Sequence, residues 1–278
     1  MLAPMTVTMT KPMIKPALKR STAAIQACFV LAAAFGLTAP CVQAQTLTPL
    51  LAVQGAQGTQ AQAPWRVVGF PDAKTPAKTP LPLTRFEVAT VQGERALKVS
   101  TQASYGTLVH ELPQVAAGRL QWRWRLDQAL TDGKAAPDIL RKAGDDAALK
   151  VCVMFDHPLS RVPFVERTLL RVARSVSGED LPAATLCYLW DSTYPAGTQG
   201  DNPYSRRVRF ISLQGLGAAL GQWQNESRDV AADFAKAFAD ELPAKAPVPT
   251  VRAVLIGADS DNTGSQSLGW VQSLDWVR

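Results

Sequence analysis

The sequence predicts a mainly β protein, a jelly-roll-type antiparallel β-sandwich with two short helices. Most apolar runs are short and alternate with polar residues, as side chains do along a strand that has one buried face. Only two segments show apolar residues at the spacing of a helix. Many short strands joined by polar loops, with few helical crossovers, are typical of two packed sheets.

The clearest strands lie between residues 119 and 156. Residues 119–127 read RLQWRWRLD, so tryptophan and leucine alternate with charged or polar side chains, and the two sets lie on opposite faces. A polar connection ending in Gly144-Asp145-Asp146 leads to a second apolar strand, residues 148–155. We expect these two strands to form the middle of an antiparallel sheet.

Eight further runs have the composition of strands. They cover residues 65–70, 86–90, 96–100, 105–112, 186–190, 207–213, 251–258 and 267–277. Gln92-Gly93-Glu94 is a hairpin signal between the second and third of these runs. In the last run the alternation predicts one core-facing set, made up of Leu268, Trp270, Leu274 and Trp276.

Two segments break the β pattern. Residues 161–176 predict an amphipathic helix that ends at Ser177-Gly178 and packs its apolar face against the protein. That face consists of Phe164, Thr168, Leu169, Val172 and Val176, with Arg167, Arg171 and Arg174 outside. Residues 229–240 predict a second short helix, in which Val230, Phe234 and Phe238 are spaced by four.

The first 44 residues have the pattern of a secretory signal peptide. A basic stretch at residues 11–20 precedes an apolar run at residues 23–39, and small residues before Ala44 predict cleavage there. Met9 and Met13 remain alternative starts. Residues 45–64 are rich in Gln, Ala, Thr and Gly, which predicts a flexible linker, and residues 65–278 form a single domain. We therefore expect a periplasmic or secreted protein without a transmembrane segment after cleavage.

Charge argues against a nucleic-acid partner. The whole chain carries 29 Lys and Arg against 23 Asp and Glu, but the predicted leader holds four basic residues and no acidic one. The remainder is close to neutral, so its composition lacks the basic excess that nucleic-acid binding requires.

Cys152 and Cys187 are the two cysteines that follow the leader, and each lies in an apolar, strand-like run. An oxidising compartment permits a disulfide between them if their strands are neighbours. The alternative is that both are small buried hydrophobic residues.

Asp259 and Asp261 follow an apolar strand, a pattern that superficially matches the nucleophile motif of haloacid-dehalogenase-like phosphatases. That chemistry needs a downstream lysine, and none follows. An EF-hand is excluded because Trp270 stands where the loop needs its last glutamate. The remaining alternatives are a hydrogen-bonded turn or a single Ca²⁺ held by Asp259 and Asp261, and we expect no other cofactor.

Histidines are too few for a zinc site or a serine triad, since the chain has only His110 and His157. Acid–base hydrolysis of a sugar polymer instead needs two carboxylates across a cleft. The candidates for such a pair are Asp145, Asp146 and Glu226, although exposed acids are usually only solvated. The chain therefore favours a non-catalytic protein and leaves an enzyme open.

Several motifs in order resemble one bacterial family, the domain of unknown function 3047. They are WRWRL, GDDAALKVCVMFD, LCYLWD, NPY, the run from Trp223 to Val230, and ADSDNTG, and the resemblance covers residues 65–278. It implies an exported protein with a fold similar to carbohydrate-binding modules. The family has no established catalytic residues, so the resemblance assigns none here.

These observations predict a non-catalytic protein that binds a glycan or another envelope ligand. A hydrolase or lyase acting on envelope polysaccharide, and a structural or assembly factor, are the alternatives. The expected ligand-binding face combines Arg123, Arg125, Asp145, Asp146, Trp190, Tyr204, Asp259, Asp261 and Asn262. We also expect the two acidic loops to meet, with Arg123 and Arg125, or Ca²⁺, compensating their charge.

Overall fold

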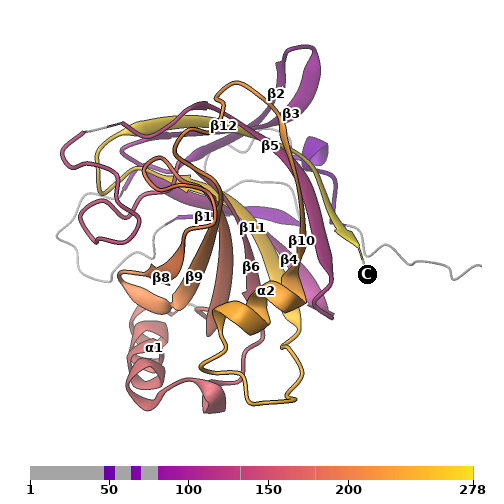
Figure 1. Ribbon diagram of the computed structural model, residues 1–278, viewed down its shortest axis with the longest axis vertical. Helices are drawn as coiled ribbons and strands as arrows, with labels where there is room; N and C mark the ends of the chain where they lie inside the picture. The colour runs from indigo at the N-terminus through magenta and orange to yellow at the C-terminus, as the bar shows by residue number, and fades with distance from the viewer. Residues whose placement is uncertain (1–46, 54–63, 70–80, 132, 179, 278) are drawn as a thin grey trace, which may run out of the picture. The chain divides into compact units, whose positions relative to one another are not determined.

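The computed structural model describes residues 47–53, 64–69, 81–131, 133–178 and 180–277. The predicted signal peptide and most of the predicted linker lie outside these residues. The described part is mainly β, with two sheets and two α-helices, so the predicted fold class is confirmed (Figure 1). Within this part no helix is long and apolar enough to cross a bilayer.

One sheet has seven strands, and its neighbours run antiparallel except for one parallel pair, β7 with β9. Across the sheet the strands are β1 (Trp65–Val68), β4 (Tyr105–Val115), β11 (Val251–Asp259), β6 (Leu149–Phe155), β7 (Ala184–Trp190), β9 (Ser205–Gln214) and β8 (Gln199–Asn202). The second sheet has five, β10 (Gln224–Asp229), β5 (Arg119–Gln128), β12 (Gln266–Val277), β3 (Glu94–Gln102) and β2 (Arg85–Val91).

An aromatic core joins the two sheets. From β5, Trp122 packs on Tyr188 and Trp124 packs on Trp190, with ring centroids 5.4 and 5.6 Å apart. Both tryptophans of β5 are buried, as the alternation predicts. The expectation that β5 and β6 are central strands of one sheet is wrong, because β6 lies in the seven-stranded sheet, across the core from β5.

Three local expectations about strands also differ from the structure. Strands β8 and β10 appear where loops are expected, because both are short, polar strands at sheet edges. In β12 the expected core face is correct for Leu274 and Trp276 but wrong for Leu268 and Trp270. A bulge at Ser273, with φ of 53°, shifts the alternation, so Val271 enters the core and Trp270 lies outward beside Arg125.

The two α-helices lie where the sequence predicts them, and their ends are set by capping residues. In α2 (Val230–Ala237), Asp229 caps the N-terminus by accepting a hydrogen bond from the Ala232 amide at 3.0 Å. Val230, Phe234 and Phe238 are buried as predicted.

Helix α1 (Phe164–Ser177) ends at Gly178 in a left-handed conformation, also as predicted. Its apolar face, however, is exposed: Phe164 is 73% accessible.

Part of the predicted linker is ordered against the core. Leu47, Leu50 and Val53 are buried, and a short 3-10 helix, η1 (Leu50–Ala52), lies among them. The Trp65 indole donates a hydrogen bond to the Thr48 carbonyl at 2.9 Å. The expectation of a flexible linker is therefore wrong for residues 47–53. Burial of their three apolar side chains stabilises this segment against the core, although the residues around them are polar.

Candidate functional site

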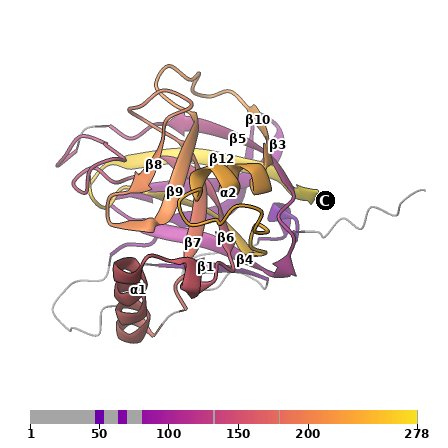
Figure 2. The ribbon, with the colours of Figure 1, turned by 60° about the horizontal axis from the view of Figure 1, so that its bottom comes forward.

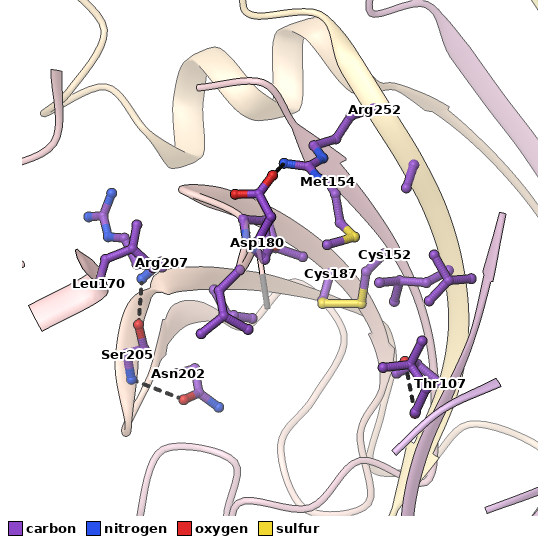
Figure 3. A pocket seen from close by; sticks show the side chains of 18 of the residues that line it. Thr107, Cys152, Met154, Leu170, Asp180, Cys187, Asn202, Ser205, Arg207 and Arg252 are labelled. Carbon is purple, nitrogen blue, oxygen red and sulfur yellow. Dashed lines mark hydrogen bonds and ion pairs between the residues drawn. A yellow bond between two sulfur atoms is a disulfide. The ribbon is translucent and has the colours of Figure 1, made fainter. Parts of the chain in front are cut away.

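A groove of about 960 Å³ lies over the outer face of the seven-stranded sheet. This size falls within the range of small-molecule binding sites, which is about 300–1,000 Å³. The floor comes from β4, β6, β7 and β11, and one wall comes from α1 and the segment that follows it. Figure 3 shows this groove with its disulfide at the base.

The floor is apolar because the central strands carry apolar side chains on both faces. In β6, Val151 and Val153 enter the core between the sheets, while Cys152 and Met154 face the groove. Leu255 of β11 and Val109 of β4 continue this floor. Strands buried on both faces read as continuous apolar runs instead of alternating ones.

Cys152 and Cys187 are disulfide-bonded, so of the two alternatives the structure contains the bond. They are direct partners in the antiparallel pairing of β6 with β7, which brings their Cα atoms to 4.0 Å. The bond therefore fixes two floor strands to each other at the base of the groove (Figure 3).

Polar groups mark one end of the groove. Lys150, the first outward residue of β6, pairs with Asp259 at 2.9 Å and lies 5.5 Å from the centre of the Tyr105 ring. Asn202, the last residue of β8, and Tyr204, in the turn before β9, also line this end. Tyr204 is more than half exposed. The groove thus has an apolar floor with a charged, hydrogen-bonding group at Lys150, and further charged residues, among them Arg66, Glu111, Asp180, Arg207 and Arg252, line it elsewhere.

Both acidic loops meet behind this polar end, as expected. Asp146 accepts hydrogen bonds from the Thr263 amide at 2.7 Å, the Thr263 hydroxyl at 2.6 Å and the Asn262 amide at 3.1 Å. Asp145 accepts one from the Asn202 side chain at 2.6 Å. Asp259 accepts one from the Ala147 amide at 2.9 Å. The cluster therefore ties the loop before β6 to the turn after β11.

Burial governs the ionisation of these carboxyls. It raises the pKa of Asp145 to about 6, although the hydrogen bond from Asn202 opposes the shift. Burial, followed by the charges of Asp259 and Asp146, raises the pKa of Asp261 to about 6. Burial is the largest single influence on Lys150 and lowers its pKa, but the charges of Asp259, Tyr105 and Asp145 and the hydrogen bond to Asp259 together outweigh burial, so the pKa is raised. Lys150 is thus the cation that offsets the cluster.

Three carboxylates are close enough to share a metal ion. Oxygen atoms of Asp146, Asp259 and Asp261 lie within 4.8 Å of one another. Lys150 and Thr263 already engage Asp259 and Asp146, whereas one buried oxygen of Asp261 has no hydrogen-bond partner among the described residues. Ca²⁺ at Asp259 and Asp261 therefore stays a prediction, in which the ion would compete with Lys150.

Arg123 and Arg125 do not compensate the acidic loops, so that expectation is wrong. They point outward from β5, where Arg123 pairs with Glu94 at 3.0 Å and Arg125 pairs with Asp127 at 2.5 Å. The alternation that buries the tryptophans of β5 sends both arginines away from the seven-stranded sheet. The cation of the cluster, Lys150, comes from the sheet itself.

Two further expected site residues also lie elsewhere. Trp190 is 1% exposed and belongs to the core between the sheets, so it cannot meet a ligand. Glu226 of β10 accepts hydrogen bonds from Trp124 at 3.0 Å and Gln214 at 2.8 Å. It therefore shares no contact with Asp145 and Asp146. Among the expected residues the structure brings together Asp145, Asp146, Tyr204, Asp259, Asp261 and Asn262.

Sequence reasoning missed the groove floor and Lys150. The signal was present in β6, where LKVCVMF has apolar side chains at outward as well as inward positions. A strand with one face in water would not carry Cys152 and Met154 outward. The lysine at the start of this run is likewise unusual for a strand covered on both faces, and it indicates a nearby acid.

Fold and groove together define a β-sandwich protein with a recessed site on one sheet. The family model described as protein of unknown function, DUF3047, matches residues 63–275, so the chain belongs to this family. No curated protein matches the chain.

Solved structures give distant likenesses. A structure of TmCBM61 in complex with beta-1,4-galactotriose has a TM-score of 0.30 at 12% identity, over 78% of this chain and 89% of that one. The Trichoderma harzianum endoglucanase 3 from family GH12 has a TM-score of 0.35 at 11% identity, over 77% of this chain and all of that one. These scores are too low to carry an argument about the site.

Proposed function

We propose that this protein is an exported, non-catalytic binding protein of the cell envelope, and that the groove holds its ligand. The ligand class is amphipathic. An apolar chain lies along Val109, Cys152, Met154 and Leu255, and a polar head group meets Lys150. Asn202 and Tyr204 offer hydrogen-bond donors and acceptors to a sugar or phosphate head group, and Tyr105 is a further polar residue in the lining.

One observation carries this proposal: the apolar floor is recessed and ends in a charged group. Leu255 and Val109 are less than a tenth exposed although they face outward from the sheet. Burying an aliphatic ligand chain on such a floor is worth about 0.8 kcal/mol per CH₂ group. Sugar rings, by contrast, are usually held on exposed aromatic faces, whereas the middle of the floor at Val109, Cys152, Met154 and Leu255 has no aromatic ring, and the aromatic lining residues Tyr105 and Tyr204 lie at the polar end.

Non-catalytic binding is supported by the state of the candidate acids. Asp146 is saturated by hydrogen bonds from Thr263 and Asn262, and Glu226 is held on the other sheet. A pair of carboxylates across the groove is what hydrolysis of a sugar polymer needs. Asp145, Asp146 and Glu226 do not form such a pair across the groove.

Location in an oxidising compartment is supported by two observations. The first 44 residues have the signal-peptide pattern, and the Cys152–Cys187 bond crosses the floor of the groove. Structural disulfides persist in the periplasm and outside the cell but are rare in the cytosol.

A fatty acid that carries an environment-sensitive fluorophore tests the proposal. We expect saturable binding to the wild type and at least roughly tenfold weaker binding to Leu255→Arg, which places a charge on the floor. Leu216→Arg is the matched control, because Leu216 is 69% exposed in the loop after β9. Binding that fails to saturate, or that survives Leu255→Arg unchanged, would refute the groove as the site.

A further inference from the structure

Helix α1 presents an apolar stripe that the sandwich does not cover. Val165, Leu169, Val172 and Val176 follow one another at intervals of four, three and four residues, so they lie on one face. Each of them is more than half exposed. In both views α1 lies at the periphery of the body, beyond β8 and β9 (Figures 1 and 2).

The stripe is exposed because another face anchors the helix. Leu170 is buried against Val162 and Ala183 in a small cluster of its own. Glu166 pairs with Arg207 of β9, and Arg174 donates to the Leu181 carbonyl at 2.8 Å. These contacts attach α1 to the sandwich through the side that faces away from Val172. The stripe is therefore exposed although the helix is held in place.

The polar face of α1 carries a net positive charge. The one acidic residue of α1, Glu166, is already paired with Arg206 and Arg207, and Arg174 is paired with Asp180 at 3.2 Å. Arg167 and Arg171 have no acidic partner among the described residues. The helix therefore combines exposed aliphatic side chains with two uncompensated cations, the exposed Arg171 and the half-buried Arg167.

We propose that α1 docks on the surface of an anionic lipid bilayer. A helix with a long aliphatic stripe and arginines on its polar face is the form that lies in the headgroup region, with the stripe in the acyl boundary and the long arginine side chains reaching toward the phosphates. The stripe extends over the whole length of α1 and is convex, as a flat lipid surface requires, whereas a protein partner would need a matching groove.

The apolar stripe of α1 is continuous with the groove, which favours a lipid bilayer as its partner. Leu169 belongs to the stripe and also lines the groove, as does Ala173 one turn further on. A docked helix would thus place the apolar wall of the groove at the bilayer, where acyl chains are available. The docking surface itself does not depend on the proposed ligand, because it rests on the exposure and charge of α1.

Vesicle sedimentation with the purified exported protein tests the docking. We expect binding to phosphatidylcholine vesicles that contain phosphatidylglycerol, weaker binding at high salt, and little binding without the anionic lipid. Val165→Ser/Val172→Ser should bind at least roughly tenfold more weakly, since two aliphatic contacts are lost. Leu216→Ser/Leu220→Ser, which alters two other exposed leucines, should bind like the wild type.

A second variant separates charge from apolar contact. Arg167→Gln/Arg171→Gln should lose the preference for phosphatidylglycerol. Circular dichroism should show unchanged folding for each variant, because all these positions except the half-buried Arg167 are exposed and serine and valine have similar helix propensity. A wild type that ignores anionic vesicles, or serine variants that still sediment fully, would overturn the docking.

The fluorescent fatty-acid titration, made without vesicles, keeps the two proposals apart. Val165→Ser/Val172→Ser should bind the probe as the wild type does, because neither residue lines the groove. Vesicle binding without probe binding would refute the groove ligand and leave the docking standing. Probe binding without vesicle binding would do the reverse.

Discussion

At the scale of single residues, Lys150 connects the fold to the site. It stands at an outward position of β6, where its hydrogen-bonded contact with Asp259 is mostly buried. The pair offsets part of the repulsion among four neighbouring carboxyls and leaves a cation at the polar end of the groove. The carboxyl that benefits least is Asp261, since one of its oxygens has no hydrogen-bond partner among the described residues.

Asp261→Asn should stabilise the protein at neutral pH. The pKa of Asp261 is raised from 3.8 to about 6 in the folded protein. Above pH 6 the carboxyl is ionised and lowers the stability of the fold. Below pH 3.8 it is protonated in both the folded and the unfolded chain, and this cost is absent. Stability should therefore fall as pH rises from about 4 to 6 in the wild type, and the variant should lose part of this slope. Allowing for partial exposure, we expect a gain of about 1–2 kcal/mol at pH 7.5.

Melting temperatures at pH 7.5 and pH 4 measure this effect, with an expected gain of about 2–8 °C at the higher pH alone. A gain of the same size at both pH values would contradict the electrostatic cause. Added Ca²⁺ provides a second comparison: if Asp261 is a ligand, Ca²⁺ should raise the melting temperature of the wild type and not that of the variant.

Among the elements, alternation and spacing predicted most strands and both helices. Strand β5 is the best case, because its tryptophans and arginines alternate without interruption. The bulge at Ser273 defeated the same rule in β12, since one extra residue inverts the alternation and a sequence does not mark where it occurs. Periodicity also predicted α1 correctly while misassigning its face, because an apolar stripe does not say whether protein or lipid covers it.

The site was predictable only in part for a related reason. Acidic loops after Gly144 and after β11 were expected to meet, and they do, because β6 and β11 are neighbours in the sheet. The sheet to which Arg123 belongs depends on the order of the strands, which is a long-range property. No local pattern distinguishes a charged side chain on one sheet from one on the other.

Loss of the Cys152–Cys187 bond should destabilise the protein. The cysteines are separated by 35 residues, and closing a loop of that length in the unfolded chain accounts for about 3–4 kcal/mol. Cys152→Ala/Cys187→Ala should show this loss in a denaturant titration, with an added cost for the smaller side chains in the floor. Reduction of the wild type separates the two effects, because it breaks the bond and keeps both sulfur atoms. Unchanged stability after complete reduction would contradict the expectation.

In the whole molecule, three features of the fold act together. The aromatic core holds the two sheets together, which leaves the outer face of the seven-stranded sheet available for the groove. Helix α1 forms one wall of that groove and presents an exposed apolar stripe beside it. Lys150 places a mostly buried cation beside the apolar floor of the groove. Together these features support an envelope protein that takes an amphipathic ligand at a lipid surface.

Photolabelling tests the central claim, that the groove binds an amphipathic ligand, most directly. A fatty acid with a diazirine in its chain would be bound, irradiated and located by mass spectrometry of the digested protein. We predict adducts on the outward residues of β6 and β11, such as Met154 and Leu255, and their loss in Leu255→Arg. Adducts confined to the outer face of β5 and β12, or an absence of adducts at saturating probe, would contradict the claim.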